Sequence, residues 1–333
     1  MTGPVRFQLT DEQRALKNAT RELLAARFDR DRLRAAVGDP APDRALWREL
    51  GAAGFFALRL PEEAGGVGLG LPEAVLVFEE AGRALLPGPL VACQLLAGAV
   101  DGVADGERIV GLCDGDREPV LWEHPCACDE LILLEGGAPD LAHGPGGAQG
   151  RTVGAYRSVA GKVSRAPFAS VDPLTPLARV TDHPRTTPLN GPDVTRLRRE
   201  AALLTAAQQL GSALRTVEMA VGHARVRTQF GAPIGSFQAV KHLCAQMLVR
   251  AEIARSALYA ASVTDEATDV AGAKLLADEA AVRNARDCLQ IHGGTGFTWE
   301  ADVHLHLKRA WLRAGSWGTA GEAEELLAAQ LVG

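Results

Sequence analysis

The sequence predicts a mainly α-helical protein with a small β-domain in the middle of the chain. Apolar residues recur at helical spacing in the first third and in the last 140 or so residues, as is typical of amphipathic helices. Between them, short β-prone runs alternate with glycine, proline and aspartate. Aromatic residues make up only 5% of the chain, which suits a helix-rich interior. We therefore expect an N-terminal helical domain (1–106), a shortened middle β-domain (107–192) and a C-terminal four-helix bundle (193–333).

Composition excludes several classes of function. The chain has 333 residues, enough for a large core, and a formal net charge of −6 with both signs scattered evenly. This charge pattern argues against a nucleic-acid surface. No run approaches the ~18 apolar residues of a membrane span, and residues 1–14 lack the apolar core of a signal peptide. We expect a cytoplasmic protein that contacts neither nucleic acid nor membrane.

The six cysteines are scattered, which favours reduced thiols over a disulfide framework. His124, Cys126 and Cys128 stand close together in the sequence, but a second pair of ligands is missing. Because a closed zinc site needs four ligands at a recognisable spacing, we expect no metal.

The N-terminal third reads as helices joined by glycine-containing turns. Thr10 and Gln13 form a capping box at the start of a helix, and further helices are expected at 45–53 and 72–84. The loop 60–70 is dense in glycine, as phosphate-binding loops are. It lacks the terminal Gly-Lys-Ser/Thr of a P-loop and the preceding strand of a dinucleotide-binding unit, so a phosphate loop is disfavoured.

The middle of the chain predicts a small antiparallel β-domain, with a glycine-rich excursion at 136–150. Its β-prone runs are 109–110, 120–121, 131–134, 152–153 and 178–180. From residue 193 three long helices follow, and Gly211 and Gly222 indicate close helix crossings. Such a bundle generally buries its remaining apolar stripe against a partner subunit.

Two segments carry more polar residues than a helix connection needs. In 227–242, Arg227 is a charged fork suited to a diphosphate, while Gln229 and Gln238 suit ribose, adenine or phosphate edges. The alternative is a capped helical hairpin with a solvated arginine. In 290–300, a glutamine and paired glycines at a helix end let a ligand approach the backbone, unless the pair is only a C-cap after the helix.

The order R-x-Q-F-G-x-P-I-x-x-F-Q-x-V-K-H in the first segment resembles the flavin clamp of the acyl-CoA dehydrogenase family. The N-terminal pattern W-x-x-L-G-x-x-G…L-P-E-E-x-G-G-x-G…E-E-x-G-R-x-L-x-P, from Trp47 to Pro87, is similar to that family as well. The resemblance implies an acyl-CoA dehydrogenase-like fold. In that fold the N-terminal helices help wall the acyl pocket and the β-domain contacts the flavin ring. This β-domain is reduced, and the family's threonine- and serine-rich flavin segment and its tryptophan partner are not found here.

The resemblance also implies FAD as the cofactor. In the family, these two segments bind the FAD whose flavin belongs to the neighbouring subunit's site. Relatives often have a small hydroxyl residue where this chain has Gln229. Matched residue by residue, the clamp comprises Arg227, Gln229, Phe230, Gln238, Gln290, Gly293 and Gly294, with Gly318 and Thr319 as further flavin-site positions.

The family removes the α-proton of an acyl thioester while the β-hydrogen leaves as hydride to the flavin, and the proton needs a carboxylate base. In the commonest branch a glutamate precedes the Gly-Thr pair, where this chain has Trp317. In a second branch the base stands at the position of Ala201. Neither residue accepts a proton, so no catalytic residue stands at the usual positions.

Three other glutamates lie near these positions in the sequence. Glu200 points about 100° away from Ala201 round the helix, and it is interpreted as a solvated glutamate. Glu322 and Glu324 are interpreted as first-turn helix charges.

The resemblance thus implies that the chain keeps the half of the site that it lends to a neighbour and has lost much of the half that it would use itself. This asymmetry resembles actinobacterial α2β2 acyl-CoA dehydrogenases, in which FAD lies between unlike subunits and many substrates are sterol side-chain CoA thioesters. We expect the base-lacking subunit of such a heterotetramer, whose partner is a second acyl-CoA dehydrogenase-like chain and whose substrate is an acyl-CoA. The alternatives are a self-sufficient homo-oligomeric flavoenzyme with an atypical base such as Glu200, and a flavin-free acyl-CoA binder or scaffold.

Overall fold

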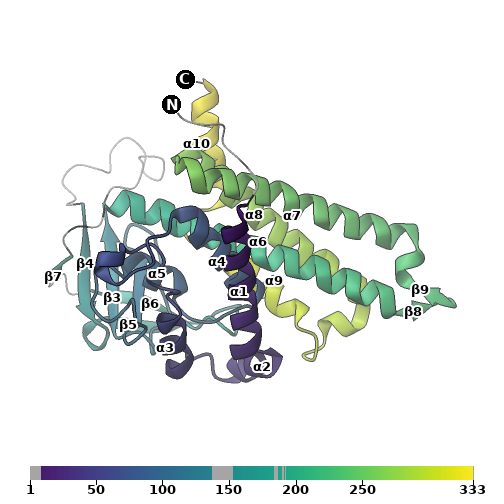
Figure 1. Cartoon of the computed structure of the whole chain (residues 1–333), viewed down its shortest axis with the longest axis horizontal. Coiled ribbons are helices and arrows are strands. Elements are labelled where there is room, and N and C mark those ends of the chain that lie inside the picture. Colours follow the sequence, from purple (N-terminus) through teal and green to yellow (C-terminus); the bar gives the residue numbers. More distant parts are fainter. Residues whose placement is uncertain (1–8, 137–152, 184–186, 190, 192, 333) are drawn as a thin grey trace. The chain divides into compact units, whose positions relative to one another are not determined.

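The computed structural model describes residues 9–136, 153–183, 187–189, 191 and 193–332 and is mostly helical (Figure 1). Helices at both ends of the chain enclose, in sequence, a small β-region, which confirms the predicted fold class. The N-terminal elements are α1 (Asp11–Arg27), α2 (Arg30–Gly38), α3 (Arg44–Ala52), the 3-10 turn η1 (Glu62–Ala64), α4 (Leu71–Arg83) and α5 (Leu90–Leu96). The C-terminal elements are α6 (Val194–Val226), β8 (Thr228–Gln229), β9 (Ala232–Pro233), η4 (Ile234–Ser236), α7 (Gln238–Thr264), α8 (Ala267–His292), η5 (Gly293–Phe297), α9 (Val303–Ala314) and α10 (Ala320–Val332).

The first helix begins as its sequence predicts. The Gln13 N–H donates to Thr10 Oγ1 at 3.1 Å, and the Thr10 N–H donates to Gln13 Oε1 at 3.0 Å. This reciprocal pair confirms the capping box and satisfies two backbone donors that a helix start otherwise leaves unpaired.

The glycine-dense loop after α3 is glycine-rich because it folds tightly on itself. A Cβ at Gly66 would lie 2.1 Å from the carbonyl oxygen of Leu60, and Gly65 and Gly68 have φ angles of 76° and 71°. Close backbone approach and the left-handed conformation both favour glycine, so the loop has a structural reason for its composition.

The β-region forms two small sheets. Its elements are β1 (Val110–Asp114), β2 (Leu121–Glu123), β3 (Glu130–Glu135), β4 (Gly154–Val159), the 3-10 turn η3 (Ala160–Lys162), β5 (Ser164–Phe168), β6 (Leu177–Asp182) and β7 (Thr187–Pro188). One sheet has the order β1-β3-β4-β7 and the other β2-β6-β5. The expected glycine-rich excursion lies almost wholly outside the described residues, as does Thr152 of one expected strand.

The purely antiparallel prediction was wrong for one pair of strands. β1 and β3 run parallel, with Val110 opposite Glu130, whereas the other pairs are antiparallel. The connection between them, residues 115–129, contributes β2 to the other sheet. Because the chain crosses to the other sheet and back, β3 can run in the same direction as β1. A tight hairpin could only join them antiparallel.

Two compact units of about equal size emerge from the packing, and each combines segments distant in sequence. The first unit consists of Met1–Asp29, Val75–Leu86 and Thr205–Leu327, and the second of Arg30–Ala74, Pro87–Leu204 and Ala328–Gly333. The sequence instead predicts three domains that follow one another along the chain, and the borders of these domains stay a prediction.

In the first unit, buried ion pairs join α1 to α4, and a hydroxyl of α7 adds a hydrogen bond to them. Lys17 Nζ lies 2.5 Å from Glu79 Oε1, and the Tyr259 hydroxyl donates to Glu79 Oε2 at 2.7 Å. Arg21 holds Glu80 through two hydrogen bonds of 2.8 and 2.7 Å. Glu79 and Glu80 are almost fully buried, so these cations and the hydroxyl satisfy charges that would otherwise destabilise the fold.

The second unit contains the β-region and the start of α6. Arg198 near the beginning of α6 binds Asp114 at 2.7 Å and Asp116 at 2.9 Å, at and just after the end of β1. Its guanidinium fork therefore fixes the first turns of the long helix on the sheet.

Candidate functional site

The first polar segment forms a short hairpin that projects beyond α6. Strands β8 and β9 pair antiparallel, with Thr228 opposite Pro233 and Gln229 opposite Ala232. The two residues between the strands, Phe230 and Gly231, have φ angles of 50° and 77°. A left-handed conformation at both central positions is the geometry of a two-residue type I′ hairpin. Figure 1 shows the β8–β9 hairpin beyond the ends of α6 and α7.

The hairpin and the start of α7 present their polar side chains to solvent. Arg227, Gln229 and Gln238 are exposed, and within the described part of the chain no hydrogen bond or ion pair engages their side chains. Phe230 is 94% exposed and meets Phe237 edge to face at 6.2 Å. The guanidinium and the two amides thus have no side-chain partner among the described residues, as expected of groups that bind something outside the chain.

The second segment lies at the end of α8. Gln290 is exposed, and the helix stops at Gly293, whose φ of 60° and ψ of −145° belong to glycine. A Cβ at Gly293 or Gly294 would meet nothing within 4 Å. In contrast with Gly66, no neighbour requires glycine at these two positions, and a ligand can approach the bare backbone there.

Packing brings the two segments to the same end of the bundle. A buried cluster joins Ala220 and Ala224 of α6, Met247 of α7, Cys288 and Leu289 of α8, and Val303 of α9. Above it, the rings of His223 and His292 stack at 4.2 Å. Arg227 follows His223 by one helical turn, and Gln290 precedes His292 by two residues. An exposed guanidinium, three free amides and an open glycine backbone fit the diphosphate and nucleoside of FAD.

Gly318 and Thr319 lie elsewhere on the same bundle. Lys274 of α8 donates to the carbonyl oxygens of Arg313 at 3.0 Å and Gly318 at 3.5 Å. Lys274 stands sixteen residues before Gln290 on this helix, roughly 24 Å along its axis at 1.5 Å per residue. Within one chain, the Gly318–Thr319 turn and the Arg227–Gln290 segments are therefore not brought together.

The turn itself caps a helix. The Thr319 N–H donates to Glu322 Oε2 at 2.7 Å, and the Thr319 hydroxyl donates to the same oxygen at 3.0 Å. Glu322 thus acts as a first-turn charge of α10, as expected. Trp317 is half-buried and has a φ of 55°, a left-handed conformation that is strained for a bulky side chain.

The interpretation of Glu200 as a solvated glutamate was wrong. Its side chain is buried, and Arg59 binds it through two hydrogen bonds of 2.6 and 2.7 Å. Arg196, one turn earlier on α6, adds a bond of 2.8 Å. Burial alone would raise the pKa of Glu200, but the hydrogen bonds and charges of Arg59 and Arg196 together lower it. A carboxylate held ionised by two guanidinium groups is a poor proton acceptor, and the neighbouring Ala201 is fully buried.

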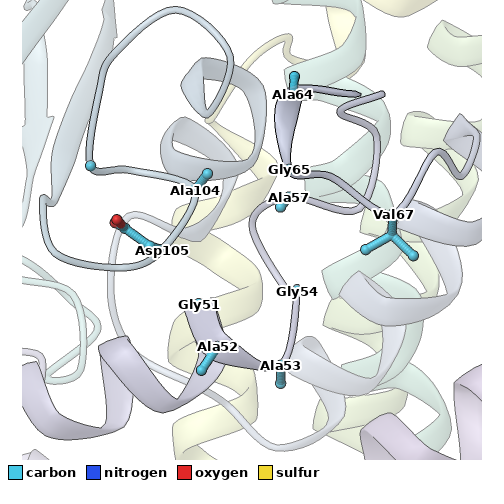
Figure 2. A pocket seen from close by; sticks show the side chains of 11 residues that line it. Gly51, Ala52, Ala53, Gly54, Ala57, Ala64, Gly65, Val67, Ala104 and Asp105 are labelled. Carbon is cyan, nitrogen blue, oxygen red and sulfur yellow. The ribbon is translucent and has the colours of Figure 1, made fainter. Parts of the chain in front are cut away.

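A hollow of about 520 Å³ in the second unit is lined almost entirely by small residues. Figure 2 shows short side chains such as Ala52, Ala57 and Ala104, with Asp105 as the charged group. Asp105 Oδ1 accepts the backbone N–H of Glu107 at 3.1 Å and is thus part of a local turn. The hollow lacks a set of groups for catalysis and is not the candidate site.

The cysteine-rich stretch has structural contacts. His124 Nε2 accepts the backbone N–H of Gly88 at 3.1 Å, and burial raises the pKa of the Cys128 thiol well above its usual range. All six cysteines are free thiols. Among the described residues, no cluster of three or more metal-ligating side chains occurs, and no helix has the length and apolarity needed to cross a membrane.

Sequence reasoning missed several residues that shape these sites. Arg59 stands in the N-terminal third, and only the fold brings it to Glu200. His223 and His292 each lie within a turn of a predicted clamp residue, and that proximity was the available signal.

Comparisons with protein families match both ends of the chain. The family model described as "Acyl-CoA dehydrogenase, N-terminal domain" matches residues 10–103, and the model described as "Acyl-CoA dehydrogenase, C-terminal domain" matches residues 195–331. Acyl-CoA dehydrogenase IpdE2 of Mycobacterium tuberculosis is 35% identical over 310 residues, which cover 90% of this chain and 91% of that protein. Acyl-CoA dehydrogenase FadE34 of the same organism is 36% identical over 84% of this chain, which spans only 41% of FadE34.

Solved structures share the fold. The ChsE4-ChsE5 complex from Mycobacterium tuberculosis superposes with a TM-score of 0.80 at 24% identity, covering 98% of this chain and 99% of that one. The glutaryl-coenzyme A dehydrogenase complex with glutaryl-CoA gives a TM-score of 0.80 at 21% identity, over 98% of this chain and 97% of that one. A steroid acyl-CoA dehydrogenase variant named Tcur3481-Tcur3483 gives 0.79 at 24% identity, over 97% and 98%.

Proposed function

The chain belongs to the acyl-CoA dehydrogenase family, and we propose that it is the base-lacking subunit of a heteromeric, FAD-dependent member of that family. The complex would introduce an α,β double bond into an acyl-CoA thioester. This chain would contribute the clamp residues, and a second acyl-CoA dehydrogenase-like subunit would contribute the catalytic base.

One contrast within the chain carries this proposal. The side chains of Arg227 and Gln290 are exposed and have no hydrogen-bond or ion-pair partner among the described residues, and the backbone is open at Gly293 and Gly294. Both positions at which the family places a base hold other residues, the buried Ala201 and the half-buried Trp317. A chain that can hold a cofactor but cannot take the α-proton needs a partner for catalysis.

The separation of Gly318–Thr319 from the clamp supports a site shared between chains. Lys274 fixes the Gly318 turn roughly 24 Å along α8 from Gln290, so the two positions do not line one compact pocket of this chain. In the proposed assembly, Arg227 would bind the diphosphate through its charged fork, and Gln229, Gln238 and Gln290 would bind polar edges of the nucleoside or phosphates. Phe230 would cover an apolar face, and the Gly293–Gly294 backbone would permit close approach. Bound FAD would supply the hydride acceptor.

The relatives suggest the kind of partner and substrate. One structural neighbour is a complex of two differently named chains, ChsE4 and ChsE5, and another is named a steroid acyl-CoA dehydrogenase. We extend these properties to this chain as part of the proposal: an α2β2 heterotetramer that acts on the CoA thioester of a sterol side chain, in steroid degradation.

Replacing Arg227 tests the proposal. In the complex co-purified with its partner, Arg227→Ala should reduce FAD affinity by about 10-fold or more, because a charged hydrogen bond contributes roughly 1.5–3 kcal/mol. Absorbance gives the FAD content of the complex, and turnover is measured with an acyl-CoA substrate. Arg225→Ala is the matched control, since Arg225 is also exposed and lies two residues earlier on α6.

Unchanged FAD content and turnover in the Arg227→Ala complex would refute the proposed role. The chain purified without its partner should hold little FAD. Near-stoichiometric FAD in the lone chain would favour a self-sufficient homo-oligomer, and a flavin-free complex would favour a scaffold.

A further inference from the structure

Two histidines lie between the halves of the proposed clamp. His223 is in the last turn of α6, one turn before Arg227, and His292 is the last residue of α8, two residues after Gln290. Their rings are nearly parallel, with centroids 4.2 Å apart and an interplanar angle of 22°. This stack is a direct side-chain contact between the helix that ends just before Arg227 and the helix that carries Gln290.

The His292 ring is anchored to its own helix. Its Nδ1 lies 2.8 Å from the carbonyl oxygen of Cys288, and because a carbonyl only accepts, Nδ1 must donate. Cys288 is fully buried in the cluster that joins the helix ends. The ring orientation is therefore set by the core of the bundle.

The surroundings of the His223 ring favour its uncharged form. Burial, the neighbouring His292 and the charge of Arg227 all lower the pKa of His223 below its usual value. A neutral His223 ring can stack on the ring of His292 without the repulsion that two imidazolium rings would have.

The stack lies at the margin of the packed region. Ala224, next to His223, is buried, whereas Arg225 and the hairpin residues 226–231 are exposed. On the other side, Ile291 is buried, whereas residues 293–295 are exposed. Beyond the stack, each clamp segment continues into solvent.

We propose that the stacked pair of His223 and His292 sets the spacing between the two halves of the FAD clamp, so that Arg227 and the Gln290–Gly294 segment can engage one FAD together. This inference rests on the proposed function. A ligand held from two helix ends is bound most tightly when both ends are already placed, because less ordering is needed on binding. The two histidines are positioning residues and need not touch FAD.

Variants of His223 test the pairing in the purified heteromeric complex. His223→Ala and His292→Ala should each weaken FAD binding by about 5- to 10-fold, since either change removes the stack. The double variant should bind FAD as tightly as the single variant with the lower FAD affinity, because all three variants lose the same contact. His223→Phe restores a flat ring and should bring FAD affinity to within about 2-fold of the parent.

The measurements are the FAD dissociation constant, from flavin fluorescence on dilution, and the melting temperature of the complex. A purely structural pair would lower the melting temperature in the alanine variants and leave the FAD dissociation constant unchanged, which overturns the inference. Failure of His223→Phe to restore binding overturns it as well.

Arg227→Ala separates this inference from the proposed function. If Arg227→Ala loses FAD while the histidine variants keep it, the positioning role is wrong and the clamp stands. If Arg227→Ala also keeps FAD, the clamp itself is wrong.

Discussion

At the scale of single residues, His306 is a buried histidine in the core of the bundle. It is 3% exposed, and its Nδ1 lies 2.8 Å from the hydroxyl oxygen of Ser212. Burial, together with the charges of Arg215 and Arg309, lowers the pKa of His306 to about 3. Since an unfolded histidine has a pKa near 6.5, the unfolded chain takes up a proton between about pH 6.5 and pH 3 that the folded chain does not.

His306 should therefore make the protein less stable as the pH falls below 6.5. We expect its contribution to be a loss of up to about 1.4 kcal/mol of unfolding free energy per pH unit, and His306→Asn should remove it. Urea unfolding of parent and variant at several values between pH 7.5 and pH 5 measures both slopes. Parallel slopes would show that His306 takes up its proton in the folded state.

Glu200 shows why some residues could not be understood from the sequence. A glutamate beside an arginine on a helix is usually exposed, and the pattern predicted that. Its main partner, Arg59, is 141 positions away along the chain, and nothing local indicates the pairing. The stack of His223 on His292 likewise joins residues far apart in the chain, although each lies close to a predicted clamp residue. The clamp residues were identifiable because they lie in two continuous segments, and their role as FAD ligands stays a prediction.

At the scale of elements, α4 and α6 cross at glycines from both helices. A Cβ at Gly211 of α6 would lie 1.8 Å from the carbonyl oxygen of Glu79. A Cβ at Gly82 of α4 would lie 2.0 Å from the carbonyl oxygen of Gln208. The backbones touch here, which confirms the close crossing predicted for Gly211. The same prediction for Gly222 was wrong, since Gly222 is exposed and has nothing within 4 Å.

The two glycines of α6 form a matched pair for mutagenesis. Gly211→Ala should destabilise the fold by about 1–3 kcal/mol or more, because the added methyl group forces two helix backbones apart. Gly222→Ala should stabilise it by about 0.5–1 kcal/mol, because alanine is the better helix former and meets no neighbour. Thermal unfolding gives both values. Similar effects from the two substitutions would mean that α4 and α6 do not pack at this distance.

The elements that the sequence predicted best are those with long, regular patterns. The predicted 45–53 and 72–84 helices agree with α3 and α4 to within a residue at each end. Strand β5 was missed because its sequence, Ser-Arg-Ala-Pro-Phe, has no apolar alternation. Among the described strands it pairs only with β6, which makes it an edge strand, where proline is tolerated. The parallel pairing of β1 with β3 was missed because it depends on which sheet receives β2, a choice made by packing rather than by local sequence.

At the scale of the whole molecule, α7 carries apolar residues that the described part of the chain leaves exposed. Leu248, Val249 and Ile253 are 48%, 55% and 51% exposed, and their spacing places them along one side of the helix. Large apolar side chains clustered on a surface are typical of an interface. The Gly318–Thr319 turn is also separated from the Arg227 and Gln290 segments. Together, this separation and the exposed face of α7 favour the proposed assembly of several chains.

A charge on this face should therefore break the assembly. In the co-expressed complex, Val249→Glu should release single chains or smaller assemblies, because a buried carboxylate without a partner opposes association. Native mass spectrometry and size-exclusion chromatography report the mass. Val159→Glu is the control, since Val159 is similarly exposed, at 56%, but lies on β4 in the other unit. If Val249→Glu leaves the mass unchanged while FAD stays bound, the partner contacts this chain at its clamp end and the exposed side of α7 faces solvent. If the mass falls and FAD is lost with it, cofactor binding depends on the assembly, as a clamp shared between chains requires.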